Sequence, residues 1–78
     1  MTLIFAPDTI EFFPQTGIGQ VEQTITQQQR GRVKFMASYW FARFYQPSGA
    51  MSAWPGTTVR VIGREGLTLL VAPIDEAF

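Results

Sequence analysis

Most of the side chains that could contact a ligand lie in one stretch, Arg30 to Tyr45, with the sequence RGRVKFMASYWFARFY. Basic and apolar residues alternate along it, and in a β-strand alternate side chains share one face of the sheet. Arginine and aromatic side chains carry much of the binding energy of protein interfaces, and aromatic rings also stack on nucleic-acid bases. The alternation predicts a cationic and aromatic binding face made of Arg32, Lys34, Phe41, Arg43 and Tyr45.

The same inventory argues against catalysis. The chain has no cysteine and no histidine, which excludes disulfides, thiolate and imidazole metal sites, and imidazole base catalysis. The remaining nucleophile and base would be Ser38, Ser48 or Ser52 with Lys34. Lys34 is expected to point into water, where nothing favours the neutral amine that a base requires. We therefore predict that the chain is not an enzyme and that it holds no cofactor and no metal ion.

The charges are balanced in number but separated along the chain. Six basic residues offset six acidic ones, so the formal net charge is zero. All the basic residues lie between positions 30 and 64, and all the acidic residues lie outside that window. One interpretation is a balanced, solvated surface, and the other is an anion-seeking face that the average charge conceals.

The length of the chain, 78 residues, corresponds to one small domain, and 46% hydrophobic with 14% aromatic residues is enough material for a core. No apolar run approaches the roughly 18 residues of a transmembrane helix. The first residues lack the basic region of an export signal. These features predict a soluble, cytoplasmic domain.

The periodicity of apolar residues predicts five strands, over residues 17–26, 30–36, 39–45, 57–64 and 67–72. A slip in the first strand predicts a bulge near Gly19 or Gln20. The connector Met36-Ala37-Ser38 and the turn over 63–66 each predict an antiparallel hairpin. In the two central strands, the side chains expected to face inward are Val33, Phe35, Trp40, Ala42 and Phe44.

Five short strands without a helical period predict an all-β chain folded as a five-stranded OB-fold-like β-barrel, because closure removes exposed strand edges. Residues 1–16 lack a sustained period and contain Pro14, which predicts an irregular, partly flexible N-terminal arm. The barrel domain would then span 17–73, followed by an acidic tail over 74–78. Trp54 is expected to plug one end of the barrel.

From Gly17 to Pro73, the order of these signals resembles the soluble C-terminal domain of the NfeD family, here in a stand-alone form. The specificity lies in the whole series arriving in order with short spacers, and Phe41 departs from the family pattern, in which a polar residue would be expected. The matching signals are Gly17-Ile18-Gly19 with Thr24, Arg30-Gly31-Arg32-Val33, Trp40-Phe41-Ala42-Arg43, Pro55-Gly56-Thr57 leading into Val59-Arg60-Val61, and Gly66-Leu67-Thr68-Leu69-Leu70-Val71.

The resemblance implies an OB-fold that acts as a non-catalytic protein-binding module, working with membrane-associated stomatin-like or flotillin-like (SPFH/band 7) proteins. Larger family members join this domain to membrane helices, and some add a serine protease domain. Neither accompanies this sequence, so the binding role is what the resemblance carries over. The expected location is cytoplasmic, at the periphery of a membrane only through the partner.

The residues themselves leave an alternative open, a single-stranded nucleic-acid-binding OB-fold that stacks bases on the outward aromatic rings. The zero net charge argues against it. A purely structural role is a further alternative for Phe41 and Tyr45, which would pack under the N-terminal arm through Ile10, Phe12 or Phe13.

Overall fold

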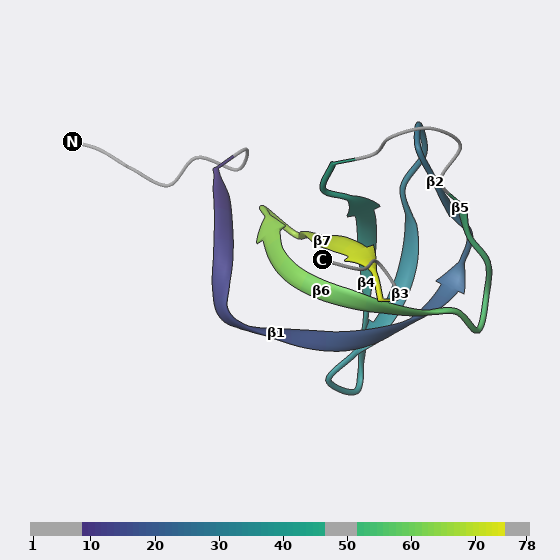
Figure 1. Ribbon diagram of the computed structural model, residues 1–78, viewed down its shortest axis with the longest axis horizontal. Helices are drawn as coiled ribbons and strands as arrows, with labels where there is room; N and C mark the ends of the chain where they lie inside the picture. Colours follow the sequence, from purple (N-terminus) through teal and green to yellow (C-terminus); the bar gives the residue numbers. More distant parts are fainter. Residues whose placement is uncertain (1–8, 47–51, 75–78) are drawn as a thin grey trace.

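Alternating apolar and polar residues build a protein made of strands. The computed structural model describes residues 9–46 and 52–74, and no helix occurs within them. Five of its seven strands close into a barrel in the order β1-β3-β4-β7-β6, and β2 pairs with β5 in a separate small sheet (Figure 1). The prediction of an all-β, five-stranded barrel is confirmed. The strands are β1 (Ile10–Gln23), β2 (Ile25–Thr26), β3 (Gly31–Phe35), β4 (Ser38–Phe44), β5 (Ser52–Ala53), β6 (Thr58–Glu65) and β7 (Thr68–Pro73).

The barrel is mixed, because one of its five strand pairs is parallel. β4 and β7 run in the same direction, with residues 41–44 opposite residues 68–71, and the other four pairs are antiparallel. β1 is long enough to pair with β6 along most of its length and with β3 near its end. This sharing of β1 closes the ring.

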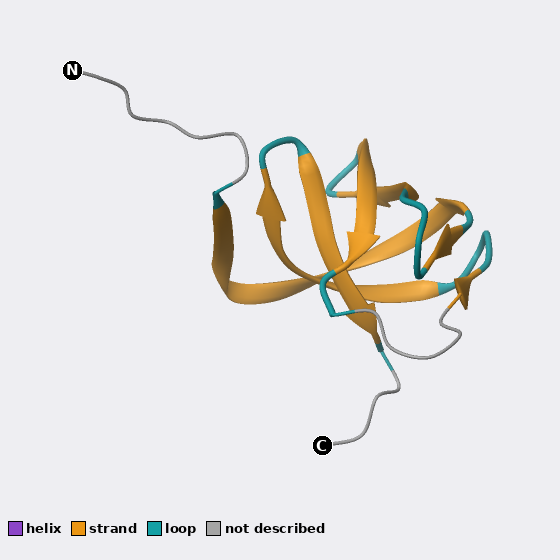
Figure 2. Cartoon of the chain, turned by 90° about the horizontal axis from the view of Figure 1, so that it is seen from above, coloured by secondary structure: helices purple, strands orange, loops and turns teal. Residues whose placement is uncertain are grey.

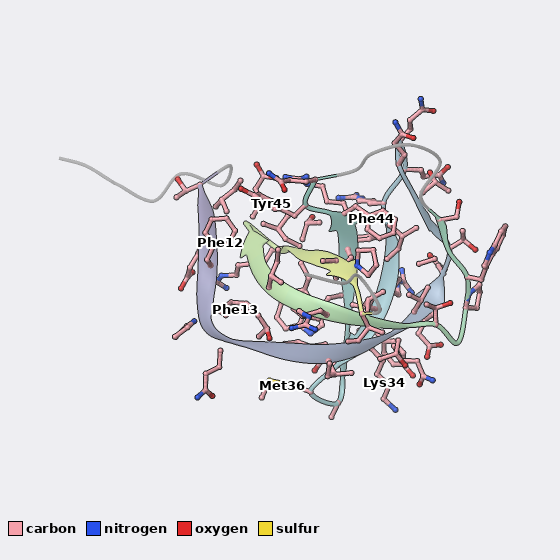
Figure 3. The ribbon with its side chains drawn as sticks, viewed as in Figure 1. Phe12, Phe13, Lys34, Met36, Phe44 and Tyr45 are labelled. Carbon is pink, nitrogen blue, oxygen red and sulfur yellow. The ribbon has the colours of Figure 1, made fainter. Side chains whose placement is uncertain are left out.

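The barrel interior is filled by the side chains that the alternation in β3 and β4 placed inside. Val33 and Ala42 are fully buried and Phe44 nearly so, and Phe44 lies within the ring of strands in Figure 3. Phe35 and Trp40 pack against this core while remaining partly exposed. The Trp40 indole N–H donates a hydrogen bond of 3.3 Å to the Phe35 carbonyl oxygen, which satisfies the polar end of the indole. The predicted inner set is therefore confirmed.

One end of the core is completed by the small sheet of β2 and β5. Ile25 and Ala53 pair across it, and both belong to the buried core cluster. Trp54, which follows β5, leaves 65% of its surface exposed. The prediction that Trp54 plugs the barrel is wrong, because the smaller Ile25 and Ala53 already supply the apolar surface there.

The expected arm is wrong for residues 10–16, which form the first half of β1. Residues 10–12 pair with residues 63–65 of β6, and Gly63 allows this approach because a Cβ atom there would lie within 3.0 Å of the Glu11 carbonyl oxygen. The register shifts between Phe12 and Gly17, and β1 bends sharply (Figures 1 and 2). Pro14 lies inside this shift, where no ladder hydrogen bond with β6 is required of it.

The predicted domain limits at residues 16 and 73 stay a prediction. Residues 1–8 of the expected arm and 75–78 of the expected tail lie outside the described residues. The predicted bulge in β1 is displaced toward the C-terminus, because the pairing with β3 shifts between Val21 and Gln23. The glycine at 19 instead lies in regular register with Val59 of β6.

Both hairpins are present, each with a two-residue turn that differs slightly from the predicted one. Between β3 and β4 the turn is Met36-Ala37, with Phe35 opposite Ser38. Between β6 and β7 it is Gly66-Leu67, so β6 continues through the residues first expected to turn. Met36 and Ala37 both have positive φ, 52° and 66°, as a type I′ turn requires. These residues adopt that conformation without the relief that glycine would give.

We expect a substitution of Gly31 by Ala to lower the free energy of unfolding by about 2–4 kcal/mol. A Cβ atom at this position would lie within 3.0 Å of the carbonyl oxygens of Gln23 and Thr24, which belong to backbone and cannot move aside alone. Gly17→Ala is the matched control, because its Cβ would meet only the ring of Phe35, a side chain that can shift. Urea unfolding of both variants checks this, and equal losses would contradict it.

Replacing the Met36-Ala37 turn with Asn-Gly should raise the free energy of unfolding by about 1–2 kcal/mol. Asn and Gly accept the left-handed conformation that costs other residues about this amount. Met36→Leu keeps an unfavourable side chain at the turn and should change stability little. Thermal and urea unfolding measure the difference, and a double variant no more stable than the parent would refute the strain.

Candidate functional site

The structure divides the predicted binding face in two. Arg32, Lys34 and Phe41 remain together on the outer side of β3 and β4, where Arg32 is opposite Phe41 and Lys34 is opposite Tyr39. Residues opposite each other in neighbouring strands point to the same side of a sheet, so these four side chains form adjacent rows. Lys34 projects away from the barrel in Figure 3.

Aromatic rings hold the basic side chains of this surface. The Arg30 Cζ atom lies 4.0 Å from the centroid of the Phe41 ring, and the Arg32 Cζ atom lies 5.6 Å from it. The Lys34 Nζ atom lies 5.9 Å from the centroid of the Tyr39 ring. Cation–π attraction of this kind fixes the position of a charged group while its N–H donors stay available. We call this surface the cationic face; its residues are Arg30, Arg32, Lys34, Tyr39 and Phe41.

Arg30 and Tyr39 were missing from the predicted set. The alternation of the strands could have found them, because residues two apart in a strand point to the same side. Arg30 is two residues from Arg32, and Tyr39 is two residues from Phe41. Arg30 lies just outside β3, which begins at Gly31, so its place above Phe41 depends on the chain continuing in nearly extended form.

A hollow of about 240 Å³ adjoins the cationic face. It is lined by Glu22 and Gln23 of β1, Arg32 of β3 and Tyr39 of β4. Glu22 lies at the register shift of β1, which carries it beside the positive residues. The surface is therefore three cations with one carboxylate at its margin.

Arg43 is not part of the cationic face, because it is paired within the fold. Its Nη2 atom lies 2.5 Å and its Nε atom 3.2 Å from the Glu65 carboxylate oxygen Oε1. Its Nη1 atom donates a further bond of 3.2 Å to the Phe44 carbonyl oxygen. Glu65 belongs to β6, so this ion pair spans β7 and joins β4 to β6. Arg43 is therefore engaged within the fold, and its part in binding stays a prediction.

Tyr45 is likewise engaged within the fold. Its ring meets the ring of Phe12 edge to face, with centroids 5.2 Å apart, and Figure 3 shows the two side chains beside each other. Arg43 is opposite Leu70, Leu70 is opposite Gly63, and Gly63 is opposite Phe12, so these residues form one row across the sheet. Leu70 in this row is fully buried. Packing against the N-terminal segment is thus confirmed for Tyr45. For Phe41 it is wrong, because Phe41 lies under Arg30 and is 41% exposed.

Among the residues that the structure describes, the ion pairs do not involve the cationic face. Within residues 9–46 and 52–74 the ion pairs are Arg43 with Glu65 and Arg64 with Glu11. In that part of the chain, no acidic group lies within ion-pair distance of Arg30, Arg32 or Lys34. The described residues also contain no cluster of three acidic side chains that could hold a metal ion.

A second hollow, of about 440 Å³, lies at the tip of the β3–β4 hairpin. It is apolar, and residues far apart in the sequence meet there, since Figure 3 shows Phe13 and Met36 on neighbouring segments. Met36, at the strained turn, is 81% exposed. The hollow is lined by Phe13, Pro14, Gln15, Phe35 and Met36.

Comparison with known proteins gives two matches and one absence. Residues 15–73 match the family model described as the NfeD-like C-terminal, partner-binding domain. A solved structure, the C-terminal domain of a stomatin operon partner protein from Pyrococcus horikoshii, is 30% identical, with a TM-score of 0.61. The likeness covers 76% of this chain and 84% of that one. No curated protein matches.

Arg43→Gln should lower the free energy of unfolding by about 1 kcal/mol, because Glu65 would keep its charge in a half-buried place without its partner. Arg64→Gln is the matched control: its ion pair with Glu11 is more exposed, with side chains 42% and 60% accessible. A loss below about 0.5 kcal/mol is expected there. Urea unfolding of both variants measures the contrast, and a larger loss in the control would refute the structural role of Arg43.

Proposed function

The chain belongs to the NfeD family, with residues 15–73 forming its C-terminal partner-binding domain, and from this membership we propose that it binds a membrane-associated stomatin-like or flotillin-like (SPFH/band 7) protein through the cationic face. The similar solved structure is named for a stomatin operon. The observation that carries the choice of surface is Phe41, an exposed aromatic ring with the guanidinium groups of two arginines near it.

The composition of the cationic face suits a protein interface. Aromatic and arginine side chains are enriched among the residues that contribute most to binding, and charged residues usually surround them. Stacking on Phe41 and Tyr39 restricts the long basic side chains before a partner arrives. Less side-chain entropy is then lost on binding, which favours affinity.

We further propose that the domain has no catalytic activity. We propose that it lies in the cytoplasm and reaches the membrane periphery through its partner. The family model supports this, because it describes a partner-binding domain. Lys34, the candidate base in the sequence, is exposed on the strand surface. Within the described ranges 9–46 and 52–74, no helix has the length and apolar character needed to cross a membrane.

The test is binding of the purified chain to a purified stomatin-like protein in nanodiscs, measured by biolayer interferometry. Phe41→Ser should weaken binding at least about tenfold, as expected for a central aromatic contact. Ile18→Ser is the matched control, because Ile18 is a similarly exposed apolar residue that pairs with Arg60 on other strands. Urea unfolding confirms that both variants are folded.

No binding of the unaltered chain to stomatin-like or flotillin-like proteins would overturn the proposed partner class. Binding that is equally strong with Phe41→Ser would overturn the proposed surface. Loss with Ile18→Ser instead would move the interface to the β1–β6 side of the barrel.

A further inference from the structure

The guanidinium groups of the cationic face are positioned but not used within the described part of the chain. Arg43 and Arg64 each donate to a carboxylate. Within the described residues, Arg30 and Arg32 form no such ion pair, and the guanidinium groups of both lie near the ring of Phe41. A guanidinium that lies over a ring keeps its N–H donors at the edge, directed away from the ring. Those edges match the two oxygens of a carboxylate.

The spacing of the positive charges is set by β3. Arg32 and Lys34 are two residues apart on the same side of this strand, which separates their Cα atoms by about 7 Å. An extended peptide has the same repeat, because its alternate side chains also share a side. Carboxylates at alternate positions of such a peptide would therefore meet the two cations in register.

We infer that the cationic face recognises a carboxylate-bearing, extended segment of the partner protein, with acidic residues at alternate positions. Arg30 and Arg32 bind one carboxylate beside Phe41, and Lys34 binds the next. This inference rests on the proposed function and adds the chemistry of the ligand. Recognition is through side chains, because β3 is paired on both edges, with β1 and β4, and has no edge for an added strand there.

The contacts of Phe41 favour a peptide over a nucleic acid. A base would have to stack on the face of the Phe41 ring, and the Arg30 guanidinium already lies 4.0 Å from its centroid. The Lys34 Nζ atom lies farther from its ring, 5.9 Å from the centroid of Tyr39. The zero net charge of the chain also gives little long-range attraction for a polyanion.

Glu22 sets a limit on the ligand. Its carboxylate lines the hollow that Arg32 and Tyr39 share, and it reduces the attraction of the face for any anion. Removing that charge should strengthen binding of an acidic segment. The sign of this effect is the opposite of what loss of a favourable contact would give, so it separates electrostatic recognition from damage to the surface.

The test is fluorescence anisotropy with three labelled probes: a peptide with glutamate at alternate positions, the same peptide with glutamine instead, and a mixed-sequence single-stranded oligonucleotide. The acidic peptide should bind at low salt and the glutamine peptide should not. The double variant Arg30→Gln with Arg32→Gln should bind the acidic peptide at least about tenfold more weakly, since charge-assisted hydrogen bonds are lost. Glu22→Gln should bind the acidic peptide more tightly. Arg64→Gln should change this binding little, because Arg64 is remote from the cationic face and is paired with Glu11.

Each other outcome overturns either the inference or the proposed partner class. Absence of acidic-peptide binding at low salt removes the carboxylate ligand, and equal binding by the Arg30/Arg32 variant removes the site. Tighter binding of the oligonucleotide, with a steep loss as salt rises, assigns the face to nucleic acid. If the acidic peptide fails while the stomatin-like protein still binds, the proposed function survives and only the ligand chemistry falls. Failure of the stomatin-like protein alone overturns the partner class instead.

Discussion

The barrel wall is a single layer of strands, and this constraint governs every side chain on it. A residue of β3 or β4 faces either the filled interior or the outside, and its neighbour in sequence faces the opposite way. Burying Val33, Ala42 and Phe44 therefore fixes which residues point outward. The same packing that stabilises the barrel aligns Arg32 with Phe41 and Lys34 with Tyr39. The packing of the core therefore sets the arrangement of the outward side chains.

The first half of β1 continues the ladder along β6 beyond the register shift. It brings Phe12 to Tyr45, and Leu70 is buried although it alternates with the core residues Leu69 and Val71. Together with the pair of Arg43 and Glu65, these contacts partly cover the far end of the β4 surface. The cationic face is therefore smaller than the run of basic and aromatic residues in the sequence.

The fold and the shared outward side of Arg32, Lys34 and Phe41 followed from period-two alternation, because burial on one side of a sheet leaves a local trace in the sequence. The engagement of Arg43 and Tyr45 left no such trace. Their partners, Glu65 and Phe12, are distant along the chain, and only barrel closure brings them near. β1 was underestimated for a related reason: Pro14 argues against a strand locally, yet the register shift tolerates it.

The parallel pairing of β4 with β7 also has a kinetic consequence. The two hairpins have two-residue turns and can form within microseconds, since their strands are adjacent in sequence. β4 and β7 meet only after the intervening chain has closed into a loop, an entropic cost paid before the contact forms. We expect closure of the barrel to limit the folding rate. Until then β4 and β7 expose unpaired backbone, so the nascent chain is most vulnerable to association with other strands in that interval.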